Sequence, residues 1–111
     1  MLDIKYGDQQ VLLGNELRIQ DTAQEPSVTV IPQEDDYTLL MIDPDTKSCH
    51  WAMSPGSSDQ PLQAYQKPDS PHRYAFLLYK QTEPLDKQSF NAQQVMENEP
   101  LKGVNFFTAK E

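Results

Sequence analysis

The sequence contains little of what several classes of protein require. It has one cysteine, Cys49, so no disulfide can form within the chain, and we expect a reducing, cytoplasmic location. Only 9 residues are lysine or arginine, against 17 aspartates and glutamates, and the formal net charge is −8. Nucleic acids and anionic membranes attract clustered basic side chains, so we expect neither as a partner. No apolar run is long enough to span a bilayer, which predicts a protein without a transmembrane segment.

The apolar residues that are present fall mostly into short strand-like runs. These runs are separated by turns rich in the 9 prolines and 4 glycines of the chain. We expect strands at 2–6, 11–13, 17–19, 28–30, 37–42, 50–53, 72–81 and 104–107. One helix is expected at 90–97, where Asn91 can cap the first turn and Pro100 lies beyond the end. A chain of 111 residues with this pattern predicts a single, mostly β domain that covers residues 1–111.

The stretch 37–45 is the centre of this pattern. Residues 37–42 are almost continuously apolar or β-compatible, which is typical of a buried strand. The sequence Asp43-Pro44-Asp45 should end that strand, because proline has no N–H and favours an extended residue before it. A second long apolar strand begins near His72. If the two strands are antiparallel neighbours, one pocket would contain Asp43, Asp45, His72 and Tyr74.

Three kinds of chemistry are compatible with such a junction. Asp43, His50 and His72 form a metal-ligand inventory, although their spacing is wide and irregular. A hydrolase would need an activated nucleophile, but Cys49 and His50 are neighbours on a strand and should point to opposite faces. The third possibility is an anion pocket. There, imidazole and hydroxyl groups donate to a phosphate-like group while the carboxylates orient the histidines and raise their pKa.

Each of these residues also has a purely structural interpretation. A histidine at a strand end is commonly a structural residue with its hydrogen bonds satisfied inside the protein. Asp43 and Asp45 could close the turn around Pro44 through side-chain-to-backbone hydrogen bonds. The residue pattern alone leaves the structural and the functional interpretations open.

The blocks that carry these residues resemble the signature blocks of the phosphatidylethanolamine-binding protein family. They are Asp43-Pro44-Asp45 with its preceding strand, His50-Trp51, and His72-Arg73-Tyr74 with the strand that follows; 2–17, 90–91 and 100–107 are similar to other parts of that family. The resemblance implies an antiparallel β-sandwich, with a large central sheet, a smaller sheet and one short late helix. It also implies a surface pocket for a phosphate-type anion, formed here by Asp43, Pro44, Asp45, His50, His72 and Tyr74.

Members of that family act as binding and scaffold proteins, including inhibitors of protein kinases and of a serine carboxypeptidase. The resemblance therefore implies a non-enzymatic protein without a cofactor. Its expected partners are a phosphate-bearing small molecule, a phospholipid head group, a protein kinase or another protein.

This sequence departs from the family pattern around the expected pocket. Thr46-Lys47-Ser48 follows Asp45 where the family usually has Ala-Pro-Ser, and the insertion that normally precedes the His-Trp block is absent. The loop 67–71 lacks the glycines whose amides line the family's pocket. Shorter walls predict a shallower, more open site. The alternative function is a degenerate domain that serves as a protein–protein interaction or scaffold subunit without a ligand.

Overall fold

A computed structural model describes residues 2–31, 36–55, 60–82 and 87–111 of the chain. Its strands form two sheets, of order β2-β1-β4 and β3-β8-β7-β5-β6. All paired strands are antiparallel except β3 and β8. The strands are β1 (Leu2–Tyr6), β2 (Gln9–Gln10), β3 (Glu16–Arg18), β4 (Ser27–Val30), β5 (Tyr37–Asp43), β6 (Ser48–Met53), β7 (Arg73–Lys80) and β8 (Leu101–Lys110). A 3₁₀-helix, η1 (Ile19–Thr22), and one α-helix, α1 (Ala92–Asn98), complete the described elements.

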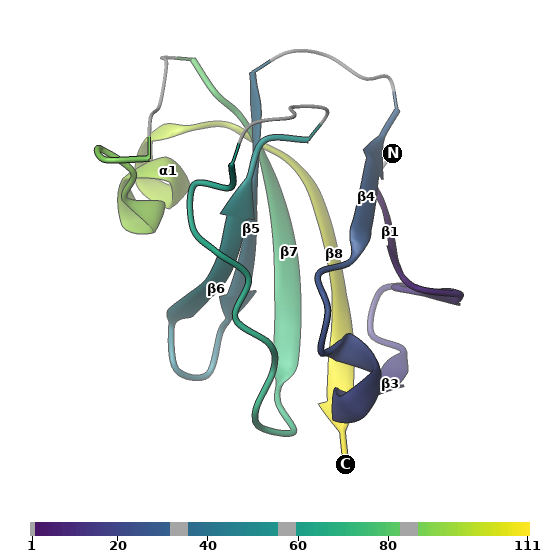
Figure 1. Cartoon of the computed structure of the whole chain (residues 1–111). Helices are drawn as coiled ribbons and strands as arrows, with labels where there is room; N and C mark the ends of the chain where they lie inside the picture. Colours follow the sequence, from purple (N-terminus) through teal and green to yellow (C-terminus); the bar gives the residue numbers. More distant parts are fainter. Residues whose placement is uncertain (1, 32–35, 56–59, 83–86) are drawn as a thin grey trace.

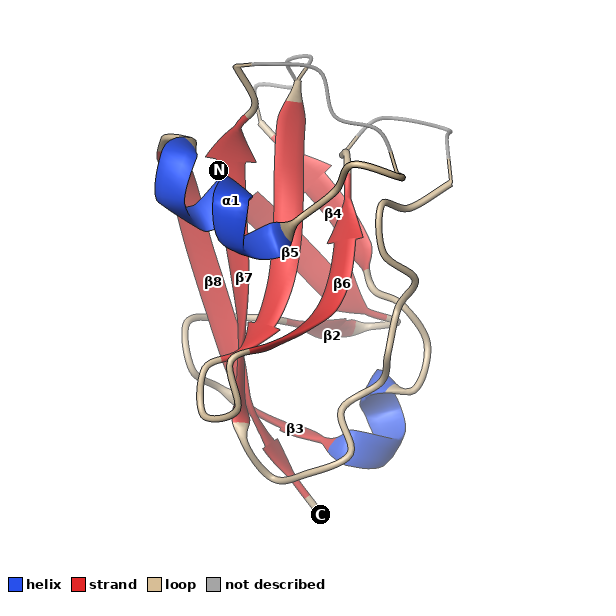
Figure 2. Ribbon diagram, turned by 90° about the vertical axis from the view of Figure 1, so that its left-hand side faces the viewer, coloured by secondary structure: helices blue, strands red, loops and turns tan. Residues whose placement is uncertain are grey.

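The larger sheet lies between the smaller sheet and α1 (Figure 1). Leu39 and Met41 of β5 belong to the core shared with the smaller sheet, while Leu40 and Ile42 belong to the core under α1. Because successive side chains of a strand point to opposite faces, β5 needs apolar residues at every position. Figure 2 shows α1 crossing in front of the larger sheet. The expected mostly β fold with two sheets and one short helix is confirmed.

Two expected strands differ in the structure. Residues 11–13 are not a strand, because β2 ends at Gln10 and Leu13 has a φ of 47°, in the left-handed region. The expected strand at 17–19 is Glu16–Arg18, and Ile19 begins η1, where the Thr22 hydroxyl donates to the Ile19 carbonyl (2.8 Å). Alternation of apolar residues could not predict either change. Asn105, distant in the sequence, binds the backbone of residues 11–13, and a local hydrogen bond of Thr22 closes η1.

The other expected elements are present near their predicted bounds. The expected helix is α1, and its N-cap is Asn91, whose side chain accepts a hydrogen bond from the Gln94 amide (3.2 Å). The last strand is longer than expected, Leu101–Lys110, because β8 pairs with β7 along most of its length. No helix of the described residues is long and apolar enough to cross a membrane.

The two long strands expected to be neighbours, β5 and β7, are paired and antiparallel. Their register runs from Tyr37 opposite Lys80 to Ile42 opposite Ala75. The end of β5 therefore lies beside the start of β7, as the sequence predicts. This pairing positions the candidate site.

Candidate functional site

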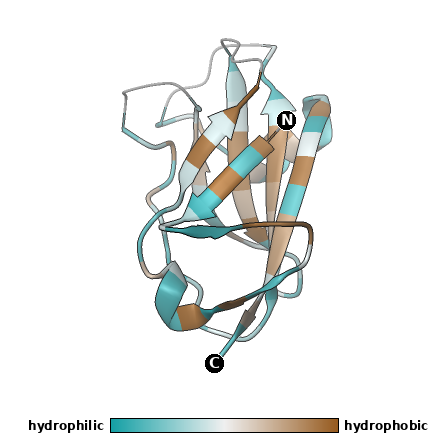
Figure 3. Cartoon of the chain, turned by 90° about the vertical axis from the view of Figure 1, so that its right-hand side faces the viewer, coloured by the Kyte–Doolittle hydropathy of each residue, from teal (hydrophilic) through white to brown (hydrophobic). Residues whose placement is uncertain are grey.

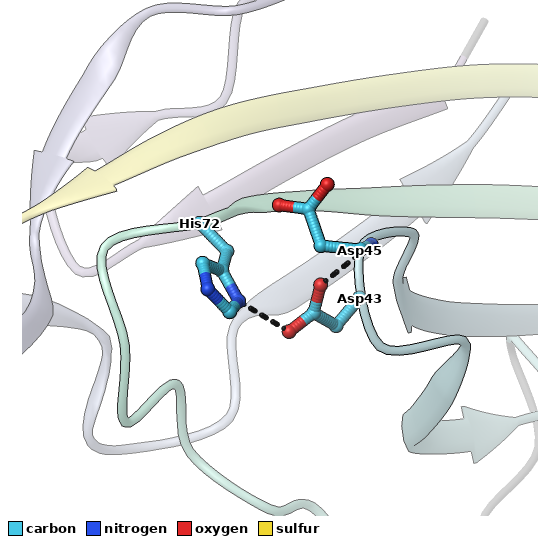
Figure 4. A group of neighbouring side chains, drawn as sticks. All are labelled: Asp43, Asp45 and His72. Atoms are coloured by element: carbon cyan, nitrogen blue, oxygen red, sulfur yellow. Dashed lines mark hydrogen bonds and ion pairs between the residues drawn. The ribbon is translucent and has the colours of Figure 1, made fainter.

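The candidate site lies where β5 ends and β7 begins. Asp43 is the last residue of β5, and His72 directly precedes β7. His72 Nδ1 lies 2.7 Å from Asp43 Oδ2 (Figure 4). The Asp43 side chain is 3% exposed, whereas that of His72 is 31% exposed. The junction thus combines a buried carboxylate with a histidine that reaches solvent.

The backbone on both sides of this contact is fixed by hydrogen bonds. Asp43 Oδ1 accepts from the Asp45 amide (3.0 Å) and the Thr46 amide (3.4 Å), so this carboxylate also closes the turn after β5. The His72 amide donates to the Ser70 carbonyl (2.8 Å), and its carbonyl accepts from the Ala109 amide of β8 (2.9 Å). Asp43 therefore has both of its expected parts, the structural one in the turn and the contact with a histidine.

The two charged groups shift each other's pKa. Burial raises the pKa of Asp43, but hydrogen bonds from the His72 imidazole and from the Asp45 and Thr46 amides outweigh burial, so the net pKa is lowered. The hydrogen bond to Asp43 raises the pKa of His72, with a smaller opposing effect of desolvation and added attraction from Asp43, Asp45 and Asp69. An ionised Asp43 beside a protonated His72 is the state that these shifts favour.

His50 and Tyr74 lie beside this pair but bond elsewhere. His50 is buried, and its Nδ1 donates to the Gln66 carbonyl (2.8 Å). The Tyr74 hydroxyl donates to the Ser70 carbonyl (3.1 Å). The two rings meet edge to face with centroids 5.2 Å apart. Among the described residues, His72 is the histidine that contacts a carboxylate, and His50 is not.

Three of the predicted site residues could contribute to a metal site. Ligand atoms of Asp43, Asp45 and His72 lie within 4.8 Å of one another. His50 is outside this group, so the structure does not assemble the set of Asp43, His50 and His72 that the sequence inventory offered. Pro44 and Asp45 are exposed in the turn. A set of one imidazole nitrogen and two carboxylate oxygens suits several divalent ions.

Cys49 does not have the surroundings of a nucleophile. Its thiol donates to the Trp51 carbonyl (3.4 Å), and burial raises its pKa. A thiol with a raised pKa carries little thiolate and reacts slowly. The Cys49 thiol and the His50 ring have separate hydrogen-bond partners, the carbonyls of Trp51 and Gln66.

Sequence reasoning missed the backbone carbonyls of Gln66 and Ser70. They accept hydrogen bonds from His50 and Tyr74 and so determine which polar groups of the site remain available. Nothing in their residue types signals this, because any residue has a carbonyl. The only clue is that both lie in the proline-containing segment that leads into β7.

No family model matches the chain. A curated relative from Toxocara canis, described as a 26 kDa secreted antigen, is 34% identical over 123 aligned positions; the match covers 91% of this chain and 47% of that protein. The chain therefore spans about half the length of this relative.

Two solved structures resemble the whole chain. A carboxypeptidase Y inhibitor, crystallised in complex with its cognate proteinase, aligns over 98% of this chain and 82% of its own, with a TM-score of 0.79 and 24% identity. A phosphatidylethanolamine-binding protein from Plasmodium falciparum aligns over 98% of this chain and 84% of its own, with a TM-score of 0.68 and 18% identity. Likeness at this level of identity shows that the chain shares the fold of these two proteins.

Proposed function

We propose that this chain, which has the fold of phosphatidylethanolamine-binding proteins, is a non-enzymatic module that binds a phosphate-type anion at His72. One observation carries the proposal. Asp43 accepts the Nδ1–H of His72, while Nε2 has no hydrogen-bond partner among the described residues. The ion pair thus fixes the ring and leaves one charged donor for a ligand. The proposed site comprises Asp43, Pro44, Asp45, His50, His72 and Tyr74.

The charges around His72 favour a zwitterionic ligand over a simple anion. The raised pKa of His72 increases the fraction of imidazolium near neutral pH, which suits a phosphate. Asp43 is neutralised by the ion pair, but Asp45 is exposed and repels a bare anion. A phosphoethanolamine group would place its phosphate on His72 and its ammonium near Asp45. The rings of His50 and Tyr74 would support the site from within the core.

A titration monitored by NMR tests this arrangement. Ring protons of His72 should shift and saturate with O-phosphorylethanolamine, shift less with inorganic phosphate, and remain unchanged with ethanolamine alone. His50 should respond less than His72, because its Nδ1 is already bonded to Gln66. Equal responses to phosphate and O-phosphorylethanolamine would remove the proposed contact between the ammonium and Asp45.

Matched variants separate the two halves of the ligand. His72→Gln should abolish the NMR response to both phosphate compounds. Asp45→Asn should lower the affinity for O-phosphorylethanolamine and raise the affinity for inorganic phosphate. Asp8→Asn removes an exposed carboxylate in the turn between β1 and β2 of the smaller sheet, whereas the site is on the larger sheet, and it should change the binding of neither ligand. Undiminished binding by His72→Gln would refute the anion site. Tighter binding after addition of Zn²⁺, reversed by EDTA, would instead assign Asp43, Asp45 and His72 to a metal.

The second candidate is a protein-binding module without a ligand. Two observations favour it: the likeness to a carboxypeptidase Y inhibitor over 98% of this chain, and the occupation of the His50 and Tyr74 polar groups by carbonyls. The direct test is carboxypeptidase Y activity in the presence of increasing amounts of the protein. Dose-dependent inhibition, together with no shift of the His50 and His72 ring protons in the phosphate titrations, would favour this candidate. Regulation of a protein kinase belongs to the first candidate, the anion-binding module, and is tested by a kinase assay of the same design.

The proposed cytoplasmic location rests on composition. Cys49 is the only cysteine, as is common for proteins of reducing compartments, whereas the relative from Toxocara canis is described as secreted. Detection of the protein by antibody in washed cell lysate or in culture medium decides between the two locations.

A further inference from the structure

A half-open groove of about 300 Å³ lies on the opposite side of the larger sheet from α1. We name it the edge groove. Its lining residues come from β1, from β2 and the segment after it, from β7 and from the first half of β8. Most of its wall is aliphatic, and its lining residues include Leu2, Val11, Leu12, Leu13, Leu78 and Val104. A groove of this size accommodates one or two apolar side chains.

The leucines on the rim are held in an unusual way. Leu12 and Leu13 are 59% and 68% exposed, and they adjoin each other on a loop. Leu13 has a φ of 47°, a left-handed conformation that is unfavourable for an L-residue with a bulky side chain. Figure 3 shows this hydrophobic segment beside β8. An exposed leucine kept in a strained conformation suggests that its position has a use.

Asn105 keeps this loop in place. Its Nδ2 donates to the Val11 carbonyl (2.9 Å), and its Oδ1 accepts from the Leu13 amide (3.0 Å). The following residue, Gly14, donates its amide to the Phe106 carbonyl (2.8 Å). The loop is thus hydrogen-bonded to the outer edge of β8 from Phe106 onward, on one side of the groove.

Beyond the loop, the outer edge of β8 is open. Phe106 and Thr108 use their outward backbone groups to bind Gly14 and Asn15. Backbone groups of alternate residues in a strand point the same way, so the N–H and C=O of Val104 also point outward. Among the described residues, none pairs with them. The edge groove therefore places an unpaired strand edge beside an apolar hollow.

One free cation lies at the same place. Lys102 lines the groove, and its ammonium forms no ion pair with any described residue. The groove's carboxylate, Asp3, accepts a hydrogen bond from Gln10 (2.6 Å) instead. In a chain with a net charge of −8, an unpaired lysine beside an apolar groove selects an acidic group on a partner.

We propose that the edge groove binds an extended peptide segment of another protein by strand addition to β8. The segment's backbone pairs with the N–H and C=O of Val104, one aliphatic side chain enters the groove beside Leu13, and an acidic residue contacts Lys102. An open strand edge distinguishes a peptide from a lipid, since only a peptide supplies the matching row of amides and carbonyls. This site is separate from the one proposed at His72.

The probe is a blocked hexapeptide of alternating valine and threonine with a glutamate at one end. Added to the ¹⁵N-labelled full chain, it should cause saturable shifts of the Val104, Lys102 and Leu13 amides. Two further peptides carry N-methyl groups, one on its valines and one on its threonines. One of the two should lose the response, because only one set of amides can face β8. Equal binding of both methylated peptides would overturn strand addition.

Variants test the groove itself. Leu13→Asn should keep or raise the stability of the protein, because asparagine tolerates the left-handed region. It should lower the affinity for the peptide about tenfold, because the apolar contact is lost. Lys102→Glu should lower the affinity for this acidic peptide, but not the affinity for a peptide in which glutamine replaces the glutamate. Ile31→Asn is the control. It removes another exposed aliphatic side chain (53% exposed), which directly follows β4, and it should leave the affinity for the peptide unchanged.

Three further results would overturn the proposal. Unchanged affinity in Leu13→Asn would exclude the groove. Concentration-dependent broadening of the Val104 amide without peptide would assign the edge to a second copy of this chain. Shifts with decanoate but not with the hexapeptide would assign the groove to an amphiphile.

Discussion

Replacing Asn105 with alanine should destabilise the protein by about 2–4 kcal/mol. The Asn105 side chain bonds three backbone groups: the Val11 carbonyl (2.9 Å), the Leu13 amide (3.0 Å) and the Phe106 amide (2.9 Å). Asn105 is 6% exposed, so water can replace these bonds only in part. A hydrogen bond contributes about 0.5–1.5 kcal/mol net, and three lost together give the stated range.

Urea unfolding followed by the fluorescence of Trp51, the single tryptophan, measures this loss. With a slope of about 2 kcal/mol/M, in the middle of the range for a small domain, the midpoint should fall by about 1–2 M. Asn98→Ala, an exposed asparagine at the end of α1, is the matched control and should change stability by less than about 0.5 kcal/mol. If Asn105→Ala behaved like this control, the clamp on residues 11–13 would carry no energy and our account of the strained Leu13 would fail.

Three other changes have outcomes that the structure fixes. Gly14→Ala should cost roughly 1–3 kcal/mol in urea unfolding, because φ is 110° and the new Cβ would lie 2.9 Å from Phe106 Cε2; a neutral result would contradict the close approach. Asp43→Asn should lower the pKa of His72 toward its ordinary value in an NMR titration. It should also flatten the pH dependence of stability. In the parent, the contribution of Asp43 is lost as pH falls through its lowered pKa, and that of His72 is lost as pH rises through its raised pKa. Asn91→Ala should cost about 0.5–2 kcal/mol, since it removes the cap of α1, and an unchanged unfolding midpoint would rule out that role.

The sequence predicted the elements that depend on periodicity and strong local signals. A continuous apolar run at 37–42 became β5, which has cores on both faces, and Asn91 became the cap of α1. The Asp43-Pro44-Asp45 sequence ended the strand close to where proline chemistry requires. Residues 11–13 show the limit of the method. Three apolar residues in a row predict a strand, but Asn105, distant in the sequence, binds their backbone and holds Leu13 in a left-handed conformation.

For the candidate site, sequence order predicted the proximity of the residues but not their bonds. Antiparallel pairing of two long strands was enough to bring Asp43 to His72. The direction in which His50 and Tyr74 bond could not be predicted, because their acceptors are backbone carbonyls of a loop. Which donor remains available to a ligand is therefore a property of the loop path.

By itself, the sequence determined that this is a β-rich chain with one late helix, organised around two strands that meet at a carboxylate and a histidine. Period-two apolarity, proline and capping chemistry act over a few residues, so they can be seen in the order of residues. Tertiary structure alone decided that Asp43 is buried while His72 reaches solvent. It also decided that, among the described residues, no strand pairs with the outer edge of β8 at Val104 beside the apolar groove. Those features depend on which segments distant in the sequence pack against each other, and only the folded chain defines these contacts.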